Sequence, residues 1–397
     1  MQEGMFLKKW APSDVDKALL EAFSIEKAKR TMAFHESFPM YCVTQLAEFS
    51  NTARKLGVKD IYVKDESRRF GLNAFKVLGG SYAIGKYIAG QMGMDENALS
   101  YQSLTDASVK KQLGDKTFVT ATDGNHGRGV AWAAKELGFR SVVYMPKGSK
   151  DERLWNIINA GADASITDMN YDDCVRLSKK MADEKSWVVV QDTAWEGYTE
   201  IPTWIMQGYG TMALEAVSQM KEAPTHVFLQ AGVGSMAAAV AAVLKNAYGE
   251  NAPKVIIVEP NKADCFYRSA LAGERTFVTG DMDTIMAGLA CGEPCTIAWE
   301  ILKCVSSAFL SCPDYAAAEG MRILARPEEG DQPIVSGESG ASAFGCVSEI
   351  LINPQYASIK DALGLNEEST LLFFSTEGDT DTNNYRAIVN SGAYPRA

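Results

Sequence analysis

Short apolar runs alternate with longer amphipathic stretches along most of this chain, and that order limits its possible folds more than any other feature. Strands that alternate with helices predict a parallel α/β architecture. Several runs are apolar without interruption, which indicates strands covered by helices on both faces. The predicted strands are Asp60–Val63, Thr117–Ala121, Ser141–Met145, Ala164–Thr167, Trp187–Gln191, His226–Leu229, Lys254–Val258 and Thr370–Phe374. The predicted helices are Gly129–Leu137, Glu152–Asn159, Asp172–Ala182, Trp204–Met220 and Met236–Ala247.

Length and charge narrow the class of protein. A chain of 397 residues is long enough for one large or two medium domains. Its formal net charge of −11, with basic residues scattered, argues against a nucleic-acid partner or an anionic membrane. No segment approaches the roughly 18 to 20 apolar residues that span a bilayer, and the N-terminus has no secretory h-region. We therefore expect a cytoplasmic protein that acts on a small molecule.

The cysteines fit the same compartment. Eight of them are spread irregularly, which is typical of reduced thiols packed as small hydrophobes. Only Cys291 and Cys295 lie close together, without a second pair of ligands nearby, so we expect no metal site. The sequence leaves open whether Cys265 and Cys291 meet in a disulfide.

A lysine in an apolar setting raises the question of chemistry. In "RFGLNAFKVLGG", residues 69–80, Lys76 stands between Phe75 and Val77 and precedes a Gly-Gly pair. A lysine that merely extends its amine out of a packed helix is one explanation. The other is an amine held in a pocket, where burial beside Phe75 would lower its pKa and make it a nucleophile.

Two loops carry small and polar residues at predicted strand ends. In "LQAGVGSM", residues 229–236, a strand runs into small residues and then a helix, which suits a phosphate but equally a tight turn. In "TATDGNHGRG", residues 120–129, four polar side chains crowd among glycines where ligand sites of parallel sheets lie. Residues 189–204, 336–343 and 374–381 form similar loops, and one pocket could draw on them all.

The histidines exclude two common mechanisms. Only three are present, at positions 35, 126 and 226, and no G-x-S-x-G elbow accompanies His126 as a Ser-His-Asp hydrolase would require. A histidine-rich catalytic metal site is equally poorly supplied. What remains is a lysine nucleophile and a phosphate cradle, a combination that suits an aldehyde cofactor carrying its own phosphate.

The motifs resemble those of the fold type II pyridoxal-phosphate (PLP) enzymes, the threonine dehydratase and cysteine synthase group. Lys64–Glu66 with "NAFKVLGG", then "TDGNHGRGVAWAAKELG", then "AGVGS" occur in that group's order. Within it, "KDESRRFGLNAFKVLGG", "QDTAWEGYTEIPTWIMQGY", "AGLACGEP" and "STEGDTD" resemble the diaminopropionate ammonia-lyase family along almost the whole chain. That resemblance implies α,β-elimination of 2,3-diaminopropionate to pyruvate and ammonia.

The resemblance also assigns roles by position. Lys76 would form the imine with the cofactor, and Asn125 would contact its phenolic oxygen. Ser375 would meet the pyridine nitrogen, with the adjacent Thr376 as the alternative. The phosphate loop would consist of Gly232, Val233, Gly234, Ser235 and Met236. A tryptophan synthase β-like fold follows, with two twisted open α/β domains and the active site in the cleft. We expect residues 1–81 and 193–397 to form the large domain and 82–192 the small inserted one, in a homodimer.

Two aspartates indicate a diamine substrate rather than a hydroxy amino acid. Asp123 replaces the small residue that the wider group has before Gly-Asn-His, and Asp192 lies on a second loop. A buried carboxylate is costly unless paired, and a substrate with a second amino group supplies a cation whereas serine or threonine does not. We expect both aspartates to hold the diamine and either to act as general acid or base, although a helix cap would also explain one of them. The alternatives are a serine/threonine dehydratase or another β-replacing enzyme, and a non-catalytic binding protein of the same fold.

Overall fold

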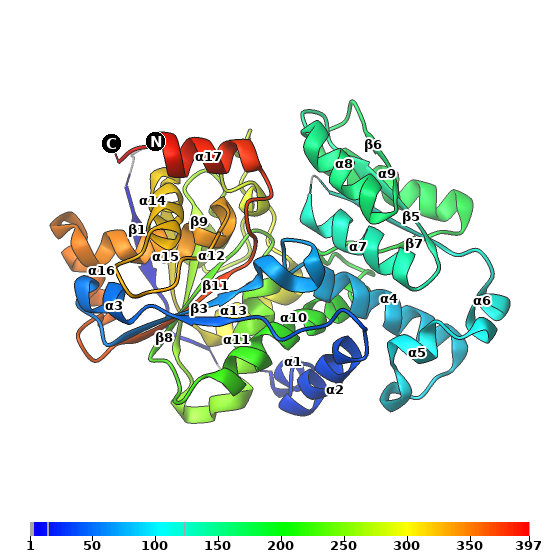
Figure 1. Ribbon diagram of the computed structural model, residues 1–397, viewed down its shortest axis with the longest axis horizontal. Helices are drawn as coiled ribbons and strands as arrows, with labels where there is room; N and C mark the ends of the chain where they lie inside the picture. Colours follow the sequence, from blue (N-terminus) through cyan, green and yellow to red (C-terminus); the bar gives the residue numbers. More distant parts are fainter. Residues whose placement is uncertain (1–3, 14–15, 123, 397) are drawn as a thin grey trace. The chain divides into compact units, whose positions relative to one another are not determined.

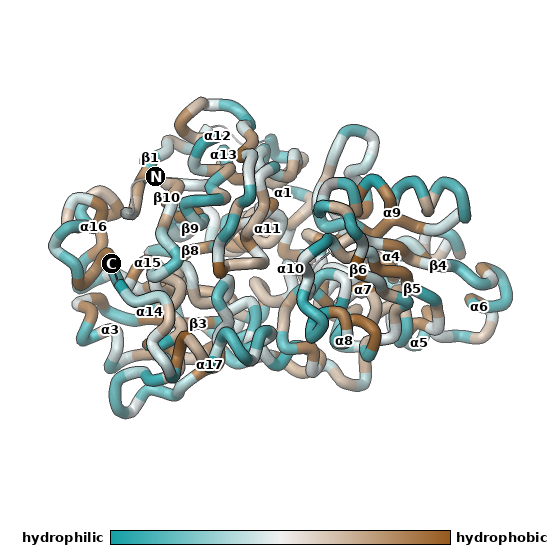
Figure 2. Tube along the Cα trace, turned by 90° about the horizontal axis from the view of Figure 1, so that it is seen from above, coloured by the Kyte–Doolittle hydropathy of each residue, from teal (hydrophilic) through white to brown (hydrophobic). Residues whose placement is uncertain are grey.

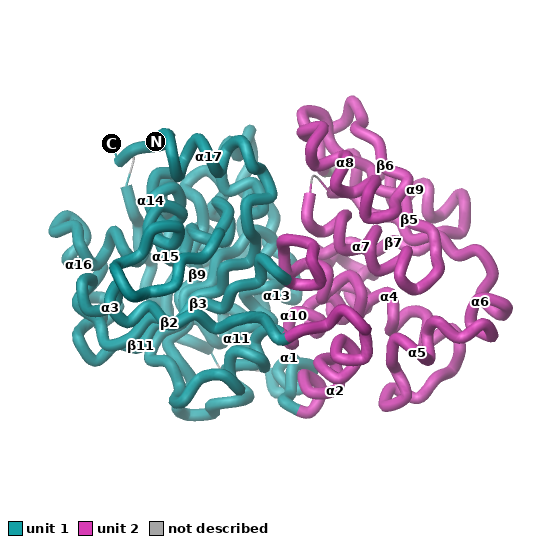
Figure 3. The backbone as a smooth tube through the Cα atoms, in the orientation of Figure 1, with its two compact units in different colours: residues 1–25, 43–68, 212–397 teal, residues 26–42, 69–211 magenta. Residues whose placement is uncertain are grey.

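The computed structural model describes residues 4–13, 16–122 and 124–396, and it divides into two compact units (Figure 3). Unit 1 comprises residues 1–25, 43–68 and 212–397, and unit 2 comprises residues 26–42 and 69–211. Unit 2 thus includes segments on both sides of residues 82–192. These units are defined by packing alone, and the domain boundaries expected from the sequence stay a prediction.

Unit 1 is built on a seven-stranded sheet of order β1-β10-β9-β8-β11-β3-β2 in the described part of the chain (Figure 1). The five inner strands are parallel, and β1 and β2 pair antiparallel at the two edges. The strands are β1 (Phe6–Lys9), β2 (Leu46–Glu48), β3 (Asp60–Asp65), β8 (His226–Gln230), β9 (Lys254–Pro260), β10 (Ser306–Cys312) and β11 (Thr370–Ser375). Parallel register places the carboxyl ends of the inner strands at one edge of the sheet, the usual place for a ligand.

Helices cover this sheet and build its core. They are α1 (Lys17–Glu21), α3 (Ser50–Leu56), α11 (Ser235–Tyr248), α12 (Cys265–Ala272), α13 (Thr296–Val305), α14 (Asp314–Ala325), α15 (Glu338–Ile352), α16 (Ala357–Leu363) and α17 (Thr382–Ser391), with α10 (Glu200–Gln219) shared between the units. The sequence of α11 begins "SMAAAVAAVL" and every residue of this stretch is buried. On β8 and β11, Phe228 and Phe373 stack with ring centroids 5.5 Å apart. These apolar layers fix the strand ends that carry the loops of unit 1.

Unit 2 contains a parallel four-stranded sheet of order β6-β5-β4-β7 among its described residues. Its strands are β4 (Thr117–Ala121), β5 (Arg140–Met145), β6 (Asp163–Ile166) and β7 (Val188–Val189). Its helices are α2 (Ile25–Glu36), α4 (Val77–Met92), α5 (Tyr101–Leu104), α6 (Ala107–Leu113), α7 (Asn125–Glu136), α8 (Asp151–Ala160) and α9 (Tyr171–Lys185). Both units therefore have the parallel α/β architecture that the sequence predicts.

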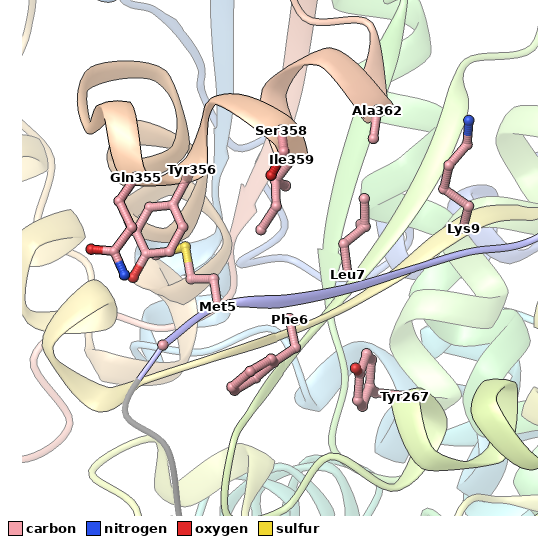
Figure 4. A pocket seen from close by; sticks show the side chains of 11 residues that line it. Met5, Phe6, Leu7, Lys9, Tyr267, Gln355, Tyr356, Ser358, Ile359 and Ala362 are labelled. Carbon is pink, nitrogen blue, oxygen red and sulfur yellow. The ribbon is translucent and has the colours of Figure 1, made fainter.

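Apolar and polar residues alternate along the trace, where brown stretches are interrupted by teal ones (Figure 2). None of the helices in the described ranges is long and apolar enough to cross a bilayer. A surface pocket of about 690 Å³ lies beside β1 and α16, where Phe6, Tyr267 and Ile359 line it (Figure 4). None of its lining residues is among the site residues expected from the sequence.

Candidate active site

Lys76 stands directly before α4, at its N-cap, with its side chain about one quarter exposed (23%). Its amine lies 2.6 Å from Oδ2 of Asp192, whose side chain is buried. An adjacent carboxylate favours the charged form of a lysine, whereas the positive end of a helix dipole disfavours it. The amine that the sequence singles out is therefore in an ion pair rather than simply extended into solvent.

Glycines fix the backbone that carries this lysine. A Cβ atom on Gly129 of α7 would lie 2.9 Å from Cα of Val77, and one on Gly208 of α10 would lie 2.3 Å from the carbonyl oxygen of Leu78. A Cβ on Gly79 would likewise meet the Tyr209 ring at 2.6 Å. The backbones of α7 and α10 thus approach the first turn of α4 more closely than any side chain permits. The Gly-Gly pair after Lys76 belongs to this packing.

Asp192 follows β7 and faces two ionisable groups of unit 2. Its Oδ2 lies 2.6 Å from the Lys76 amine and 3.8 Å from Nδ1 of His126. Burial alone would raise the pKa of this carboxyl, but the Lys76 ammonium at hydrogen-bond distance and the nearby His126 ring outweigh it and hold the pKa well below the usual range. Asp192 is therefore ionised at neutral pH, and its pairing with Lys76 compensates for its burial.

His126 is a buried neutral base behind this pair. Its Nε2 lies 2.8 Å from the carbonyl oxygen of Val190, so Nε2 carries the hydrogen and Nδ1 carries the lone pair. Among the described residues, Nδ1 has no hydrogen-bond partner. Burial lowers the pKa of the ring, and the opposing field of Asp192 does not reverse this. The unprotonated Nδ1 therefore faces the carboxylate side of the site.

Asn125 begins α7 and is half-buried, in the loop between β4 and that helix. It adjoins His126 and belongs to unit 2, as do Lys76 and Asp192. Asp123 lies outside the described residues. The polar cluster expected at the end of β4 is thus present in its Asn125 and His126 members, and the role of Asp123 stays a prediction.

The glycine loop of unit 1 joins β8 to α11. Gly234 has φ of +88° and caps the helix, a left-handed conformation that favours glycine. A Cβ on Gly234 would lie 2.2 Å from the Phe266 ring, and one on Gly232 would lie 2.9 Å from the carbonyl oxygen of Gly288. Ser235 and Met236 are buried at the helix start. The first N–H groups of a helix have no intrahelical partner, so this glycine-rich turn fits a phosphate group.

Ser375 and Thr376 lie at the carboxyl end of β11, and both are buried. The Ser375 hydroxyl donates to Oγ of Ser336 (2.7 Å), and the Thr376 hydroxyl accepts from Nε2 of Gln230 (3.0 Å). Gln230 and Ser336 lie within the segments 229–236 and 336–343 that the sequence indicates as pocket loops, but the sequence assigns neither of them a role.

The late loops of unit 1 converge beside the glycine loop. The Gly337 amide donates to the carbonyl of Glu377 (2.9 Å), and the Ser339 amide donates to its carboxylate (3.2 Å). The Gly288 amide in turn donates to the Ser339 hydroxyl (3.1 Å). The segments 336–339 and 374–381 and the "AGLACGEP" segment therefore lie together in unit 1, but residues 338–343, which the sequence predicts as part of a loop, form the first turns of α15.

The K-x-E motif serves a buried network in unit 1. The Lys64 amine lies 2.6 Å from Oε2 of Glu215 on α10 and donates to the carbonyl of Thr44 (2.7 Å). The Thr44 hydroxyl donates to Glu66 (2.6 Å). Lys64, Glu66 and Glu215 are all at most 1% exposed, so this motif anchors the segment before β2 to α10.

Neither Cys265 nor Cys291 forms a disulfide among the described residues, and the first is buried and the second half-buried. The Cys265 thiol contacts the carbonyl of Gly232 (3.7 Å) and the carboxyl of Glu259 (3.6 Å). Glu259 also accepts from the amides of Phe266 (2.8 Å) and Tyr267 (2.7 Å), at the start of α12. Burial raises the pKa of Glu259 to about 8. The described residues contain no group of three or more His, Cys, Asp or Glu side chains that could hold a metal ion.

This fold, with a lysine before a helix and a glycine-rich turn at the start of α11, defines a PLP enzyme of fold type II. The family model of pyridoxal-phosphate dependent enzymes matches residues 38–355, and the chain belongs to that family. It is 52% identical to diaminopropionate ammonia-lyase of Escherichia coli over 376 residues, which are 94% of this chain and 93% of that protein. The Salmonella typhimurium diaminopropionate ammonia-lyase is 52% identical over 368 residues, 91% of each chain.

Solved structures of related proteins have the same fold as this chain. The crystal structure of the Escherichia coli diaminopropionate ammonia-lyase in complex with D-serine has a TM-score of 0.92 at 47% identity and covers 99% of both chains. The same protein with an aminoacrylate-PLP azomethine reaction intermediate has a TM-score of 0.90 at 47% identity and covers 99% of this chain and 98% of that one. Threonine deaminase of Solanum lycopersicum has a TM-score of 0.75 at 19% identity over 98% of this chain and 97% of its own, which shows a shared fold alone.

Proposed function

We propose that this enzyme is a PLP-dependent ammonia-lyase that converts 2,3-diaminopropionate and water to pyruvate and two molecules of ammonia. The observation that carries the proposal is the ionised Asp192 carboxylate, buried 2.6 Å from the Lys76 amine. A substrate with a second ammonium group can take over that carboxylate, whereas a hydroxyl group supplies no compensating charge. The identity of 52% to two diaminopropionate ammonia-lyases supports the same substrate.

The residues present fit the cofactor. Gly232, Val233, Gly234, Ser235 and Met236 would bind its phosphate through backbone amides at the positive end of α11. Asn125 would contact the phenolic oxygen, and Ser375 or Thr376 the pyridine nitrogen. Lys76 would hold the aldehyde carbon. When bound, PLP supplies an electron sink for the electrons left when the Cα proton departs.

The chain's own groups would manage the protons. Lys76 would take the Cα proton on one face of the substrate. Asp192 would bind the second ammonium group and orient it for departure. Asp123, from the neighbouring loop, would share that task or act as the base on the opposite face. His126 is neutral and would not compete for the Asp192 carboxylate, which could therefore pair with the ammonium group of the substrate.

Substrate choice is tested by a pyruvate assay on the purified holoenzyme. The expected result is pyruvate mainly from DL-2,3-diaminopropionate, with serine and threonine much slower. Faster turnover of serine or threonine would favour the dehydratase alternative. A protein that retains no PLP and produces no pyruvate would favour the non-catalytic alternative. Lys76→Ala is the matched control, since it should abolish the cofactor absorbance that borohydride reduction otherwise removes.

We further propose a homodimer that works in the cytoplasm, with residues 82–192 as the inserted small domain. The resemblance to the ammonia-lyase family supports the dimer, and the irregular spacing of the eight cysteines supports a reducing compartment. Light scattering of the purified protein tests the dimer directly: a monomeric mass would exclude it. Native-state hydrogen exchange tests the inserted domain, because the amides of residues 82–192 should open as one cooperative unit.

A further inference from the structure

The side chain of Gln191 joins the ends of two strands in unit 2. It directly precedes Asp192, and it is 1% exposed. Its Oε1 accepts from the hydroxyl of Thr120 (2.9 Å) and the amide of Ala121 (3.1 Å) at the end of β4. Its Nε2 donates to the carbonyl of Ala121 (3.0 Å) and to the hydroxyl of Tyr171 (2.9 Å). All four hydrogen-bonding positions of the amide are therefore used.

These contacts fix the amide in one orientation. The Ala121 amide can only donate and its carbonyl can only accept, so Oε1 and Nε2 cannot exchange places. A buried network whose members are all satisfied specifies a single geometry. The backbone at Gln191 is thus tied to β4 and to the first residue of α9.

A tyrosine closes the same loop from its other end. The backbone amide of Gln191 donates to the Tyr198 hydroxyl (2.9 Å), and that hydroxyl donates to the carbonyl of Val189 on β7 (3.0 Å). Trp195 and Tyr198 form a two-residue antiparallel bridge, and their rings stack at 4.2 Å. Residues 191–198 therefore return to the strand that they leave.

The residue held between these contacts is Asp192. Its carboxylate must stay 2.6 Å from the Lys76 amine and 3.8 Å from the His126 ring, and none of these three side chains belongs to the clamp. A displacement of about 1 Å at a reacting group can cost roughly 100-fold in rate. A clamp of this kind keeps the Asp192 carboxylate in place when the second ammonium group of the substrate replaces the Lys76 ammonium as its partner.

We infer that Gln191 and Tyr198 are positioning residues, a clamp that holds the Asp192 carboxylate against Lys76 and sets the preference for a diamine substrate. The inference rests on the proposed function, in which Asp192 binds the second ammonium group. Neither clamp residue needs to touch the substrate, so their effect passes through Asp192.

A double-mutant cycle in the holoenzyme tests this. Gln191→Leu should lower kcat/KM for 2,3-diaminopropionate about 10- to 100-fold in the wild-type background. In an Asp192→Asn background the same change should cost less than about 2-fold, because the carboxylate it positions is gone. Equal losses in the two backgrounds would overturn the clamp. Gln219→Leu is the matched control, since that amide joins Lys64 and Thr44 in unit 1 and its effect should not depend on Asp192.

Spectroscopy separates failure of the clamp from failure of the proposed function. The Asp192 carboxylate favours positive charge beside it, so Gln191→Leu and Asp192→Asn should both lower the pH midpoint of the cofactor absorbance. This shift does not require turnover of any substrate. An unchanged midpoint in Gln191→Leu, with a shifted one in Asp192→Asn, would refute the clamp. Should Gln191→Leu fail to fold, Tyr198→Phe removes only the two hydroxyl hydrogen bonds and must shift the midpoint in the same direction.

Discussion

The amine of Lys76 and the carboxylate of Asp192 form a 2.6 Å ion pair at the N-terminus of α4. The pair combines the group that would hold the cofactor with a group that would recognise the substrate. Each charge compensates for the burial of the other. The substrate must therefore enter a site in which the charges of Lys76 and Asp192 already neutralise each other.

Asp192→Asn should separate the two classes of substrate. Loss of a charged hydrogen bond costs about 1.5–3 kcal/mol, so kcat/KM for 2,3-diaminopropionate should fall by about 10- to 100-fold. Serine carries no second ammonium group, and its kcat/KM should fall by a clearly smaller factor. Steady-state pyruvate assays with both substrates measure the ratio. Equal factors would mean that Asp192 acts through Lys76 alone.

Gly234→Ala should weaken cofactor binding. The left-handed φ of +88° strains any other residue, and the new Cβ would lie 2.2 Å from the Phe266 ring, so the phosphate loop must move. We expect a Kd for PLP at least about 10-fold higher, measured by dialysis and absorbance. Gly249→Ala is the matched control at the other end of α11, where φ is +57° and no atom lies within 4 Å of the new Cβ. Equal effects on the PLP Kd would point to general strain.

Removing one partner of the Lys64–Glu215 ion pair should destabilise the protein more than removing both. Glu215→Leu leaves a lysine charge buried, which should lower the free energy of unfolding by about 3–5 kcal/mol. The double variant Lys64→Met with Glu215→Leu should recover most of that loss. Urea unfolding at one protein concentration measures both variants. A double variant as unstable as Glu215→Leu would show that the network matters for more than its charge.

Glu259 should make stability depend on pH. Burial raises its pKa to about 8 in the folded chain, above the value of 4.5 expected when it is unfolded. The unfolded chain then binds fewer protons here, so the free energy of unfolding falls as pH rises from about 4.5 to about 8, by at most about 1.4 kcal/mol per pH unit. Glu259→Gln should flatten that decline in urea unfolding at pH 5 to 8. A slope unchanged by the substitution would mean that Glu259 ionises normally.

The parallel strands were predictable because their side chains are apolar on both faces. Thr117–Ala121 is confirmed to the residue as β4, and the predicted strand at His226 extends by one residue, to Gln230. The edge strands β1 and β2 were missed because each is short and neither alternates. Ser306–Cys312 was missed because three serines interrupt its apolar pattern, although the strand is almost wholly buried as β10. Trp187–Gln191 was predicted too long, since only Val188–Val189 pair and Gln191 turns to the side-chain network.

Part of the candidate site was also predictable from the sequence and part was not. Lys76 and the glycine loop were predictable because an amine among apolar residues and a run of small residues are local signals. The residues that support them could not be predicted. Gln191 bonds to residues of β4 that lie about 70 positions earlier in the chain, and Gly208 supports α4 from more than one hundred residues away. Contacts of that kind depend on tertiary packing, which no local pattern encodes.

The close packing of α4 has a consequence for redesign of the substrate range. Gly79, Gly129 and Gly208 leave no room for a Cβ beside the turn that carries the reacting amine. A library that randomises this layer would sample mostly displaced lysines, whatever substrate is supplied. The three glycines set the boundary within which this catalyst can be evolved.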